Sequence, residues 1–225
     1  MNFLQLVNRV RLDCDVARDD LSTLVGAIDE DRRIAGYVSQ AWLEIQEKYY
    51  DWDFLRHQFA FQTIVGKAEY TPAEMLITDF SDWRRDSFRI YTTSAGYGSE
   101  IYLQNLEYNS FRDYYLLNIR RTTQARPIAI SITPTRTLIL GLVPNDIYTV
   151  NGEYYSDPIV LSLDADTPII PSRFHMAIVY KAMVSYGMFE SAGEVVSRGE
   201  KQYNEMIKRI ERYQAPYVGM GNSLI

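Results

Sequence analysis

The side chains that most often carry enzyme chemistry are scarce in this sequence of 225 residues. It holds two histidines, His57 and His175, and a single cysteine, Cys14. An enzyme usually needs a group that titrates near neutrality, an activated nucleophile or a bound metal. No cysteine or carboxylate motif accompanies either histidine, and His175 stands in an apolar helical stretch, where we expect a hydrogen-bonded core residue. Cys14 is most simply a small apolar residue.

Two carboxylates, those of Asp164 and Asp166, resemble the start of a calcium-binding loop. The glycine and the distant glutamate that complete an EF-hand loop are missing, so a metal site is not predicted there. The sequence also lacks the glycine-rich phosphate loop, the nucleophile elbow, the zincin motif and the paired-cysteine motif. It therefore predicts no catalytic residue, no metal and no cofactor, and we expect a protein that is not an enzyme.

The net charge of −6 and the isoelectric point of about 5.0 bear on the partners of the chain. Non-specific nucleic-acid binding depends on lysine and arginine side chains that neutralise phosphates, so an acidic chain is poorly suited to grip DNA. One cysteine permits no internal disulfide. The first residues do not fit a signal peptide, and no apolar run approaches the roughly 20 residues that span a bilayer. We expect a soluble protein, made in a cytoplasm, with no membrane partner.

The number of tyrosines, eighteen, is unusual. Tyrosine is common at protein interfaces because it offers rigid contact area with a polar tip. A tyrosine-rich β-region explains the number equally well, so both explanations stay open.

The clearest structural signal is a pair of helices within residues 171–214. Ser172 follows a proline and precedes an apolar run, which suits a helix N-cap. From Phe174 to Phe189 the helix is apolar on nearly every face, which predicts burial in the fold or in an assembly. After a break near residues 191–193, apolar residues recur at three- and four-residue steps with charged residues between them. The segment predicts a helical hairpin, which an Ala-Pro pair ends.

Two helices are predicted before residue 56. Apolar residues within 3–10 form one face of a short first helix. From Asp31 to about Leu55 a continuous apolar stripe predicts a helix of more than five turns, with Trp42 and Trp52 on the stripe. Such a stripe is more often core than ligand pocket.

Between these helices the period of the apolar residues changes to that of strands. Residues 57–70 predict a β-hairpin, and residues 88–93 predict a strand that a flexible loop at 94–99 follows. Residues 105–117 fit either a short helix or an irregular strand. From residue 127 to 155, three strands with short turns predict an antiparallel meander.

The order of helices, strands and helices predicts an α+β fold rather than a doubly wound sheet. We expect residues 1–56 and 171–214 to form a helical bundle, and residues 57–170 to form an inserted antiparallel β-rich domain. Residues 215–225 are expected to extend from the bundle as a docking tail. The chain is long enough to bury a full core.

The predicted tail has the composition of a docking peptide. Frayed termini are usually polar, whereas this segment has no charged side chain and carries apolar residues between glycines. Extended peptides that dock into a groove on another protein look like this, so docking is favoured over fraying. The predicted docking residues are Pro216, Tyr217, Val218, Gly219, Met220, Leu224 and Ile225.

Three groups of residues, in their order and spacing, resemble one protein family. The first group is Ala41-Trp42-x-x-Ile45-Gln46 with Trp52-x-Phe54-Leu55. The second is Leu138-x-Leu140-x-x-x-Pro144, followed by Tyr148-x-Val150 and Glu153-Tyr154-Tyr155. The third is Pro171-x-x-Phe174-His175 with Ile178-Val179-Tyr180-Lys181-Ala182-Met183 and Tyr186-Gly187. Over roughly residues 3–216, the combination resembles the adaptor, or head-to-tail connector, proteins of tailed bacteriophages.

This resemblance implies a structural virion protein at the head–tail interface, assembled in the host cytoplasm. Its partners would be the portal protein, a tail or nozzle protein, and further copies of itself in a ring, typically of about twelve. Genomic DNA would pass through the lumen without sequence-specific binding, and residues 216–225 would clasp the portal. The residues expected at the subunit interface or in the core are Phe174, Ile178, Met183, Tyr186, Trp42 and Trp52.

Two other interpretations stay open. A tail-side or non-viral protein-interaction module would share the fold without docking on a portal. A hydrolase with an unrecognised site would require His57 or His175 to cluster with carboxylates in a cleft.

Overall fold

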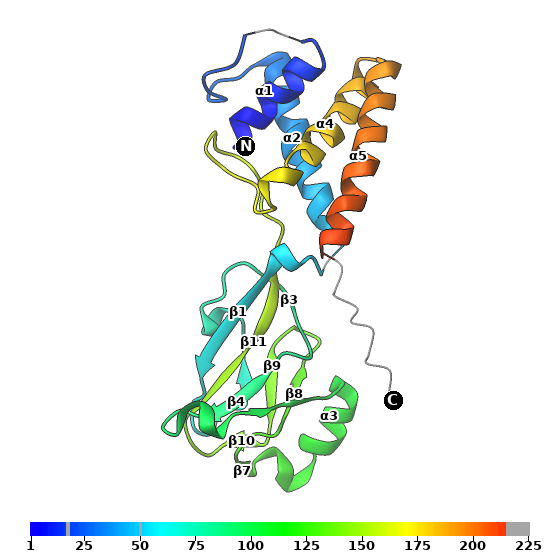
Figure 1. Cartoon of the computed structure of the whole chain (residues 1–225). Coiled ribbons are helices and arrows are strands. Elements are labelled where there is room, and N and C mark those ends of the chain that lie inside the picture. Colours follow the sequence, from blue (N-terminus) through cyan, green and yellow to red (C-terminus); the bar gives the residue numbers. More distant parts are fainter. Residues whose placement is uncertain (17–18, 50, 215–225) are drawn as a thin grey trace, which may run out of the picture. The chain divides into compact units, whose positions relative to one another are not determined.

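The computed structural model describes residues 1–16, 19–49 and 51–214 (Figure 1). The chain divides into two compact units. The helical unit consists of residues 1–54 and the described residues from Pro158 on, and the β unit consists of residues 55–157. Helices and mostly antiparallel strands fall in largely separate stretches of the chain, which confirms the predicted α+β class.

Within the described residues, the helical unit is built from α1 (Phe3–Asp13), α2 (Asp29–Glu47), α4 (Met176–Phe189) and α5 (Gly193–Gln214). A capping box starts α1, in which the Asn2 side chain accepts from the Gln5 N–H and the Gln5 side chain accepts from the Asn2 N–H. The central helix is α4, which packs against α1, α2 and α5 (Figure 1). This position explains why α4 is apolar on nearly every face, and it confirms the predicted burial.

The helical hairpin of α4 and α5 is confirmed, but α4 begins later than predicted. Residues Ser172–Phe174 form a 3₁₀ turn, η5, and α4 begins at Met176 without a side-chain cap. Ser172 is therefore not the predicted N-cap. Its backbone carbonyl accepts from the His175 N–H at 3.2 Å, so the 3₁₀ turn satisfies an amide that a capping side chain would otherwise serve.

The second helix is shorter than predicted, because α2 ends at Glu47 rather than near Leu55. Trp52 folds back, and its indole Nε1 donates to the carbonyl of Ile45 at 3.0 Å, in the last turn of α2. A 3₁₀ turn, η1 (Asp53–Leu55), follows. The side chains beyond the helix also reach the core, so the apolar spacing continues past the last helical residue.

Residues 158–170 pack with the helical unit, although the sequence favours them as part of the inserted domain. The buried side-chain amide of Gln46 donates to the Ile159 carbonyl at 3.0 Å and accepts from the Ile159 N–H at 2.9 Å. The Phe3 N–H donates to the Asp166 carbonyl at 2.7 Å. Because this loop is hydrogen-bonded to α1 and α2, the boundary falls before Pro158.

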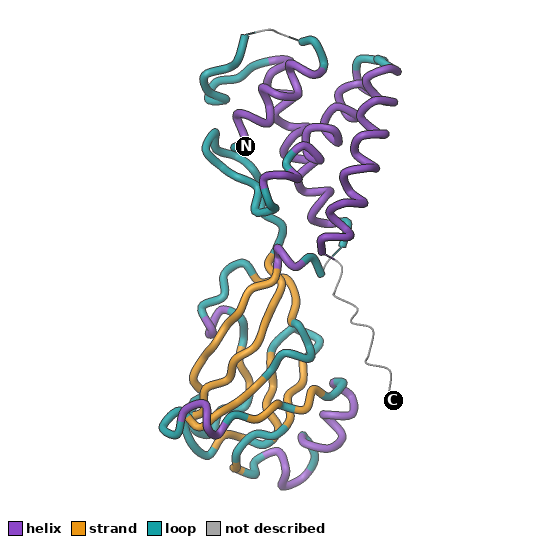
Figure 2. The backbone as a smooth tube through the Cα atoms, in the orientation of Figure 1, coloured by secondary structure: helices purple, strands orange, loops and turns teal. Residues whose placement is uncertain are grey.

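The β unit contains a five-stranded sheet in which β11 (Tyr148–Ser156) is central (Figure 2). It pairs antiparallel with β1 (Arg56–Gln62) along one edge, and with β4 (Arg89–Thr92) and β3 (Phe80–Trp83) along the other; β5 (Ile101–Tyr102) pairs with β4. A second sheet has the order β2 (Glu69–Tyr70), β9 (Leu138–Gly141), β8 (Ala129–Ile132) and β6 (Gln104–Asn105). A short parallel pair joins β7 (Gln124–Ala125) and β10 (Val143–Pro144).

Short helical segments connect these strands: η2 (Ala73–Met75), η3 (Gly96–Ser99), α3 (Tyr108–Tyr115) and η4 (Asn118–Arg121). Residues 105–117 were predicted to form either a short helix or an irregular strand, and the α3 helix shows that the first alternative is correct. The Glu107 carboxylate caps it by accepting from the N–H groups of Asn109 and Ser110 at 2.9 and 3.2 Å.

Aromatic side chains dominate the core of the β unit. The rings of Phe59 and Trp83 lie 5.0 Å apart. Three tyrosines join this core with their hydroxyls bonded: Tyr70 to the Lys67 carbonyl, Tyr148 to Asn145 and Tyr154 to Asp79. Others, such as Tyr97 and Tyr102, are exposed. Part of the tyrosine content therefore belongs to a β-region core, as one of the two explanations predicted.

Two predicted strand pairings are wrong. Residues 57–70 do not form a hairpin, because β1 pairs with β11 and β2 pairs with β9. Of the predicted meander, the β8–β9 hairpin is present, but β11 belongs to the other sheet. Alternating apolar residues indicate a half-buried strand without naming its partner, so the sequence alone favours local neighbours.

Candidate functional site: assembly surfaces

The six residues predicted for the subunit interface or core are buried in the helical unit. They are Trp42, Trp52, Phe174, Ile178, Met183 and Tyr186. The Tyr186 hydroxyl donates to Glu30 at 2.7 Å, and the Phe174 ring lies 5.5 Å from the Tyr213 ring. These side chains act as core in this structure, and their role between subunits stays a prediction.

The predicted portal-docking segment lies outside the described residues. It comprises Pro216, Tyr217, Val218, Gly219, Met220, Leu224 and Ile225. The last described residue before it, Gln214, ends α5. The docking role of this segment therefore stays a prediction.

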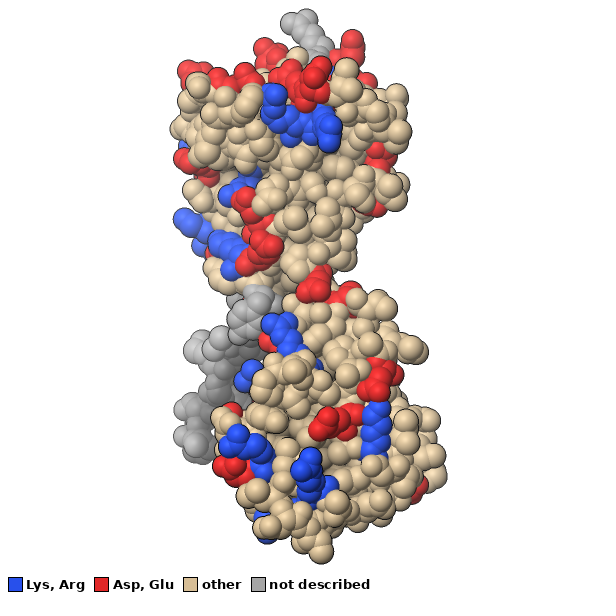
Figure 3. Space-filling view, turned by 180° about the vertical axis from the view of Figure 1, so that it is seen from behind, with Lys and Arg blue, Asp and Glu red and all other residues tan. Residues whose placement is uncertain are grey.

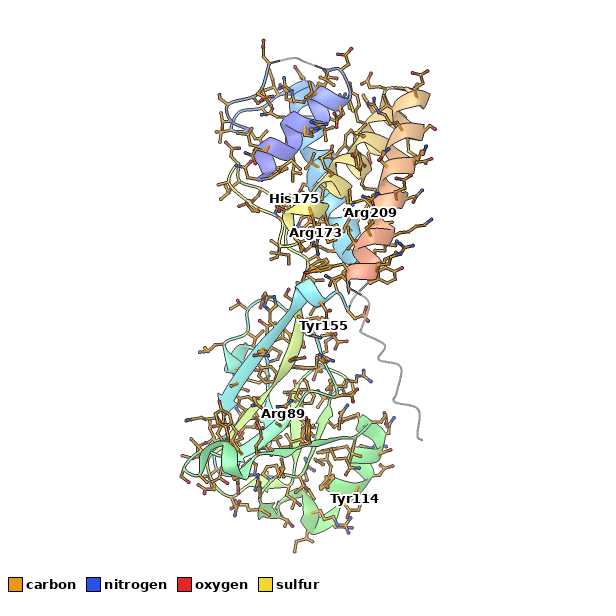
Figure 4. All side chains as sticks on the ribbon, viewed as in Figure 1. Arg89, Tyr114, Tyr155, Arg173, His175 and Arg209 are labelled. Atoms are coloured by element: carbon orange, nitrogen blue, oxygen red, sulfur yellow. The ribbon has the colours of Figure 1, made fainter. Side chains whose placement is uncertain are left out.

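The imidazole of His175 is buried where α4 begins (Figure 4). Its Nδ1 lies 2.7 Å from the α-amino nitrogen of Met1, and its Nε2 lies 3.0 Å from the carbonyl oxygen of Ile170. A neutral ring fits these partners, with Nδ1 accepting from the amino group and Nε2–H donating to the carbonyl. Burial, the largest cause, lowers the pKa of His175 below its ordinary value of 6.5. His175 is thus a hydrogen-bonded core histidine.

The other histidine, His57, is exposed on β1 in the β unit, with its ring 5.5 Å from that of Tyr154. Within residues 1–16, 19–49 and 51–214, neither imidazole makes a hydrogen bond or ion pair with a carboxylate. The cluster that a hydrolase would need is not found in this part of the chain.

The two carboxylates that resemble a calcium loop organise backbone instead. Asp164 accepts from the Thr23 hydroxyl at 2.5 Å and from the Leu24 N–H at 2.9 Å. Asp166 accepts from the N–H groups of Ser162 and Leu163 at 2.8 and 2.7 Å, and these backbone bonds lower the pKa of its carboxyl. Asp164 therefore ties the loop before α2 to the loop before α4.

The described residues give neither a reactive thiol nor a cluster of metal ligands. Burial raises the pKa of the Cys14 thiol to about 11, so it is not a reactive thiolate near neutral pH. No group of three or more His, Cys, Asp or Glu side chains among the described residues could hold a metal ion. In the same residues, no helix combines the length and the apolar character that crossing a membrane requires.

A polar groove of ≈ 570 Å³ lies on the face of the five-stranded sheet that points away from the aromatic core. Its two arginines are paired, since Arg84 lies 2.6 Å from Glu153, and Arg89 (Figure 4) lies 3.8 Å from Glu100. No histidine or cysteine is among the residues that line it. The groove therefore offers no activated nucleophile.

An exposed surface of arginine, tyrosine and aliphatic side chains covers α3 and η4. We call it the Arg–apolar patch, and its residues are Tyr114, Leu117, Ile119, Arg120 and Arg121. The exposed fractions of Leu117 and Ile119 are 53% and 78%. The Arg120 guanidinium lies 4.1 Å from the centre of the Tyr114 ring (Figure 4). Arginine and tyrosine are enriched at protein interfaces and lysine is depleted, so the patch is a candidate protein-binding surface.

A second exposed surface has the opposite charge. The acidic–apolar loop consists of Asp19, Asp20, Val25 and Ile28, which precede α2, together with Asp29, the first residue of α2. Val25 and Ile28 have exposed fractions of 83% and 71%. Figure 3 shows acidic side chains gathered at the end of the helical unit that carries this loop. Exposed aliphatic groups beside carboxylates make this loop a second candidate surface.

Sequence reasoning missed both surfaces. It left residues 105–117 undecided between helix and strand. The available signal was charge: between Arg112 and Arg126 an acidic chain carries four arginines and one aspartate, beside Leu116, Leu117 and Ile119.

Comparison with models of protein families identifies a family for this chain. A model of the SU10 adaptor protein family matches residues 1–221 of the chain. The matched residues include both units and both exposed surfaces. No curated protein matches the chain significantly.

Proposed function

The chain belongs to the SU10 adaptor protein family, and from this premise we propose that it forms an adaptor ring on the portal vertex of a bacteriophage. In this role it joins the capsid to the tail and continues the channel through which the genome passes. Its partners are the portal protein, a tail or nozzle protein, and further copies of itself. A bacteriophage adaptor is a structural component of the virion.

The observation that carries this proposal is the extent of the family match. Residues 1–221 take in the helical unit, the β unit and most of the predicted tail, so the match is not confined to one structural module. Neither histidine is joined to a carboxylate in the described structure, and Cys14 is held as a thiol. These features support a structural rather than a catalytic role.

The charge of the chain supports passage of DNA rather than capture. A surface that retains DNA needs unpaired lysine and arginine side chains that displace counterions from phosphates. This chain has a net charge of −6, and exposed acidic side chains are frequent on the helical unit (Figure 3). A lumen lined by such a surface repels the DNA backbone and lets the duplex slide. A ring whose lumen proved basic would contradict this part of the proposal.

The proposed portal contact is the segment from Pro216 to Ile225. In the sequence it begins two residues after Gln214, the last residue of α5, carries no charged side chain, and has apolar residues spaced by glycines. A peptide of this kind gains affinity by inserting apolar side chains into a groove on a folded partner.

The test is negative-stain imaging of the chain mixed with purified portal rings. Three forms are compared: the full chain, a chain that lacks residues 216–225, and a chain of full length with serine at Tyr217, Val218, Met220, Leu224 and Ile225. The serine variant separates loss of apolar contacts from loss of tail length. Native mass spectrometry of the collar then gives the number of copies.

A collar that forms with the full chain and is lost in both variants supports the adaptor role and the portal clasp together. A collar that survives in both variants keeps the role and excludes the clasp. No collar with the full chain would contradict portal docking and favour a tail-side or non-viral interaction module.

A further inference from the structure

We infer that the Arg–apolar patch of one copy binds the acidic–apolar loop of a second copy of this chain, head to tail. The inference rests on the proposed ring, because it names the two faces through which neighbouring copies would meet. Neither face belongs to the predicted interface residues, which are buried in the core.

The first argument is charge. The patch presents Arg120 and Arg121, and α3 also carries the exposed Arg112 with Asp113 beside it. The ion pair of Arg112 with Asp113 is exposed on both sides, at 53% and 66%, so solvent screens it and it can be exchanged for another partner. The loop presents Asp19, Asp20 and Asp29. Opposite charges of this kind steer association and fix register.

The second argument is apolar surface. Leu117 and Ile119 on the patch, and Val25 and Ile28 on the loop, are each more than half exposed. Burying them against each other removes aliphatic area from water, at roughly 25 cal/mol per Å². Each face thus has an aliphatic centre next to charged residues, which is the usual anatomy of a protein interface.

The third argument is rigidity, because preorganised faces lose less entropy on binding. On the loop, the Asp164 carboxylate holds Thr23 and Leu24, immediately before Val25. On the patch, Arg120 stacks on Tyr114 and its guanidinium donates to the Tyr114 carbonyl at 3.4 Å. Part of each face is therefore held in place before a partner arrives.

Symmetry favours a second copy as the partner. A closed ring needs two different, mutually complementary faces on every subunit. The patch and the loop differ in charge and match in apolar character, and each chain carries both. The portal and tail-side proteins remain the alternative occupants that the experiment must exclude.

The first experiment is disulfide trapping of the full chain in a Cys14→Ser background. Val25→Cys and Ile119→Cys together should give a ladder of dimers, trimers and larger species under mild oxidation. A mixture of a chain carrying only Val25→Cys with one carrying only Ile119→Cys should stop at the mixed dimer. Absence of both products, or a disulfide within one chain only, would overturn the inference.

The second experiment reverses charge. Arg120→Glu with Arg121→Glu, or Asp19→Arg with Asp20→Arg, should weaken self-association in sedimentation velocity by about tenfold or more. Combining all four changes should restore it. The matched control is Arg209→Glu with Arg212→Glu on α5 (Arg209 in Figure 4), which reverses equal charge outside both faces and should leave association unchanged. Failure of the combined variant to recover would contradict the pairing.

Portal binding separates the two proposals. If the ladder forms but no collar appears on portal rings, self-contact stands and the adaptor role fails. If a collar forms, but the paired cysteines give no cross-link between chains and charge reversal leaves self-association unchanged, the adaptor role stands and these two faces are not the contact.

Discussion

A Cβ atom placed on Gly199 of α5 would lie 3.0 Å from the carbonyl oxygen of Tyr180 in α4. It would also lie 2.9 Å from a methyl carbon of Val184. The two helices of the hairpin therefore approach each other more closely at this point than any residue with a side chain permits. Because the obstacle includes backbone, rotation of a flexible side chain cannot relieve it.

We therefore expect Gly199→Ala to destabilise the protein by about 1–3 kcal/mol, as overpacking of a tight helix contact does. Urea unfolding monitored by circular dichroism measures the change. Gly193→Ala is the matched control on the same helix, because nothing lies within 4 Å of its Cβ position, and it should change stability by less than about 0.5 kcal/mol. Equal effects of the two substitutions would contradict close packing at Gly199.

The buried His175 makes stability depend on pH. Its pKa is lowered in the folded protein, chiefly by burial, so the unfolded chain takes up a proton at a higher pH than the folded chain does. Its contribution to stability is complete above about pH 6.5 and is lost as the pH falls below that value. We expect the free energy of unfolding to be lower at pH 5.5 than at pH 7.5.

The difference in unfolding free energy between the two pH values should shrink in His175→Gln, which keeps a polar side chain but cannot titrate. His57→Gln removes an exposed histidine instead and should retain the wild-type difference. Carboxylates such as Asp166 and Glu211, whose pKa values are lowered, contribute to the pH dependence of stability at more acidic pH. If His175→Gln kept the wild-type difference in unfolding free energy, another group would be responsible for it.

The core of the β unit depends on a glycine in its longest strand. A Cβ atom on Gly152 of β11 would lie 2.8 Å from the Phe88 ring and 3.0 Å from the Phe59 ring. Gly152→Ala must displace these aromatic side chains, and we expect a loss of about 1–3 kcal/mol. Gly98→Ala, with nothing within 4 Å, is the control and should be nearly neutral. Near-ultraviolet circular dichroism should change only in Gly152→Ala.

The sequence predicts helices better than strand partners in this chain, for a physical reason. The faces of α1, α4 and α5 follow from residues three and four apart, which are neighbours within one helix. The partner of β1 is β11, whose residue Tyr155 faces Arg56 across the sheet. The alternation of apolar and polar side chains within residues 57–62 fits any partner strand that has a matching apolar face. The identity of the partner therefore depends on the whole fold and not on these residues alone.

The sequence pattern is limited in the same way for the predicted site residues, because it does not identify what they contact. Trp42, Ile178 and Met183 could be recognised as buried from their spacing, but spacing does not distinguish a core from an interface. The Arg–apolar patch arises where α3 meets η4 at Asn118, whose φ of 56° redirects the chain. A left-handed residue of this kind is not specified by hydrophobic periodicity, so the exposure of Leu117 and Ile119 was not predictable from the sequence.

The last prediction concerns Gln46, whose side-chain amide forms hydrogen bonds with the backbone of Ile159, as a neighbouring strand would. It is 1% exposed and bonds both the N–H and the carbonyl of Ile159, and it donates to the Trp42 carbonyl at 3.3 Å. Gln46→Ala leaves these backbone groups without a partner, so we expect a loss of about 2 kcal/mol. Hydrogen exchange at the Ile159 amide should become faster as the loop detaches from α2.

Gln40→Ala is the matched control on the same helix, because the Gln40 amide is exposed and bonds only the Glu44 side chain, at 3.3 Å. It should leave both stability and exchange at Ile159 unchanged. If Gln46→Ala also left exchange at Ile159 unchanged, other contacts would hold residues 158–170 to the helical unit. The hydrogen bond between Phe3 and Asp166 would then be the next contact to test.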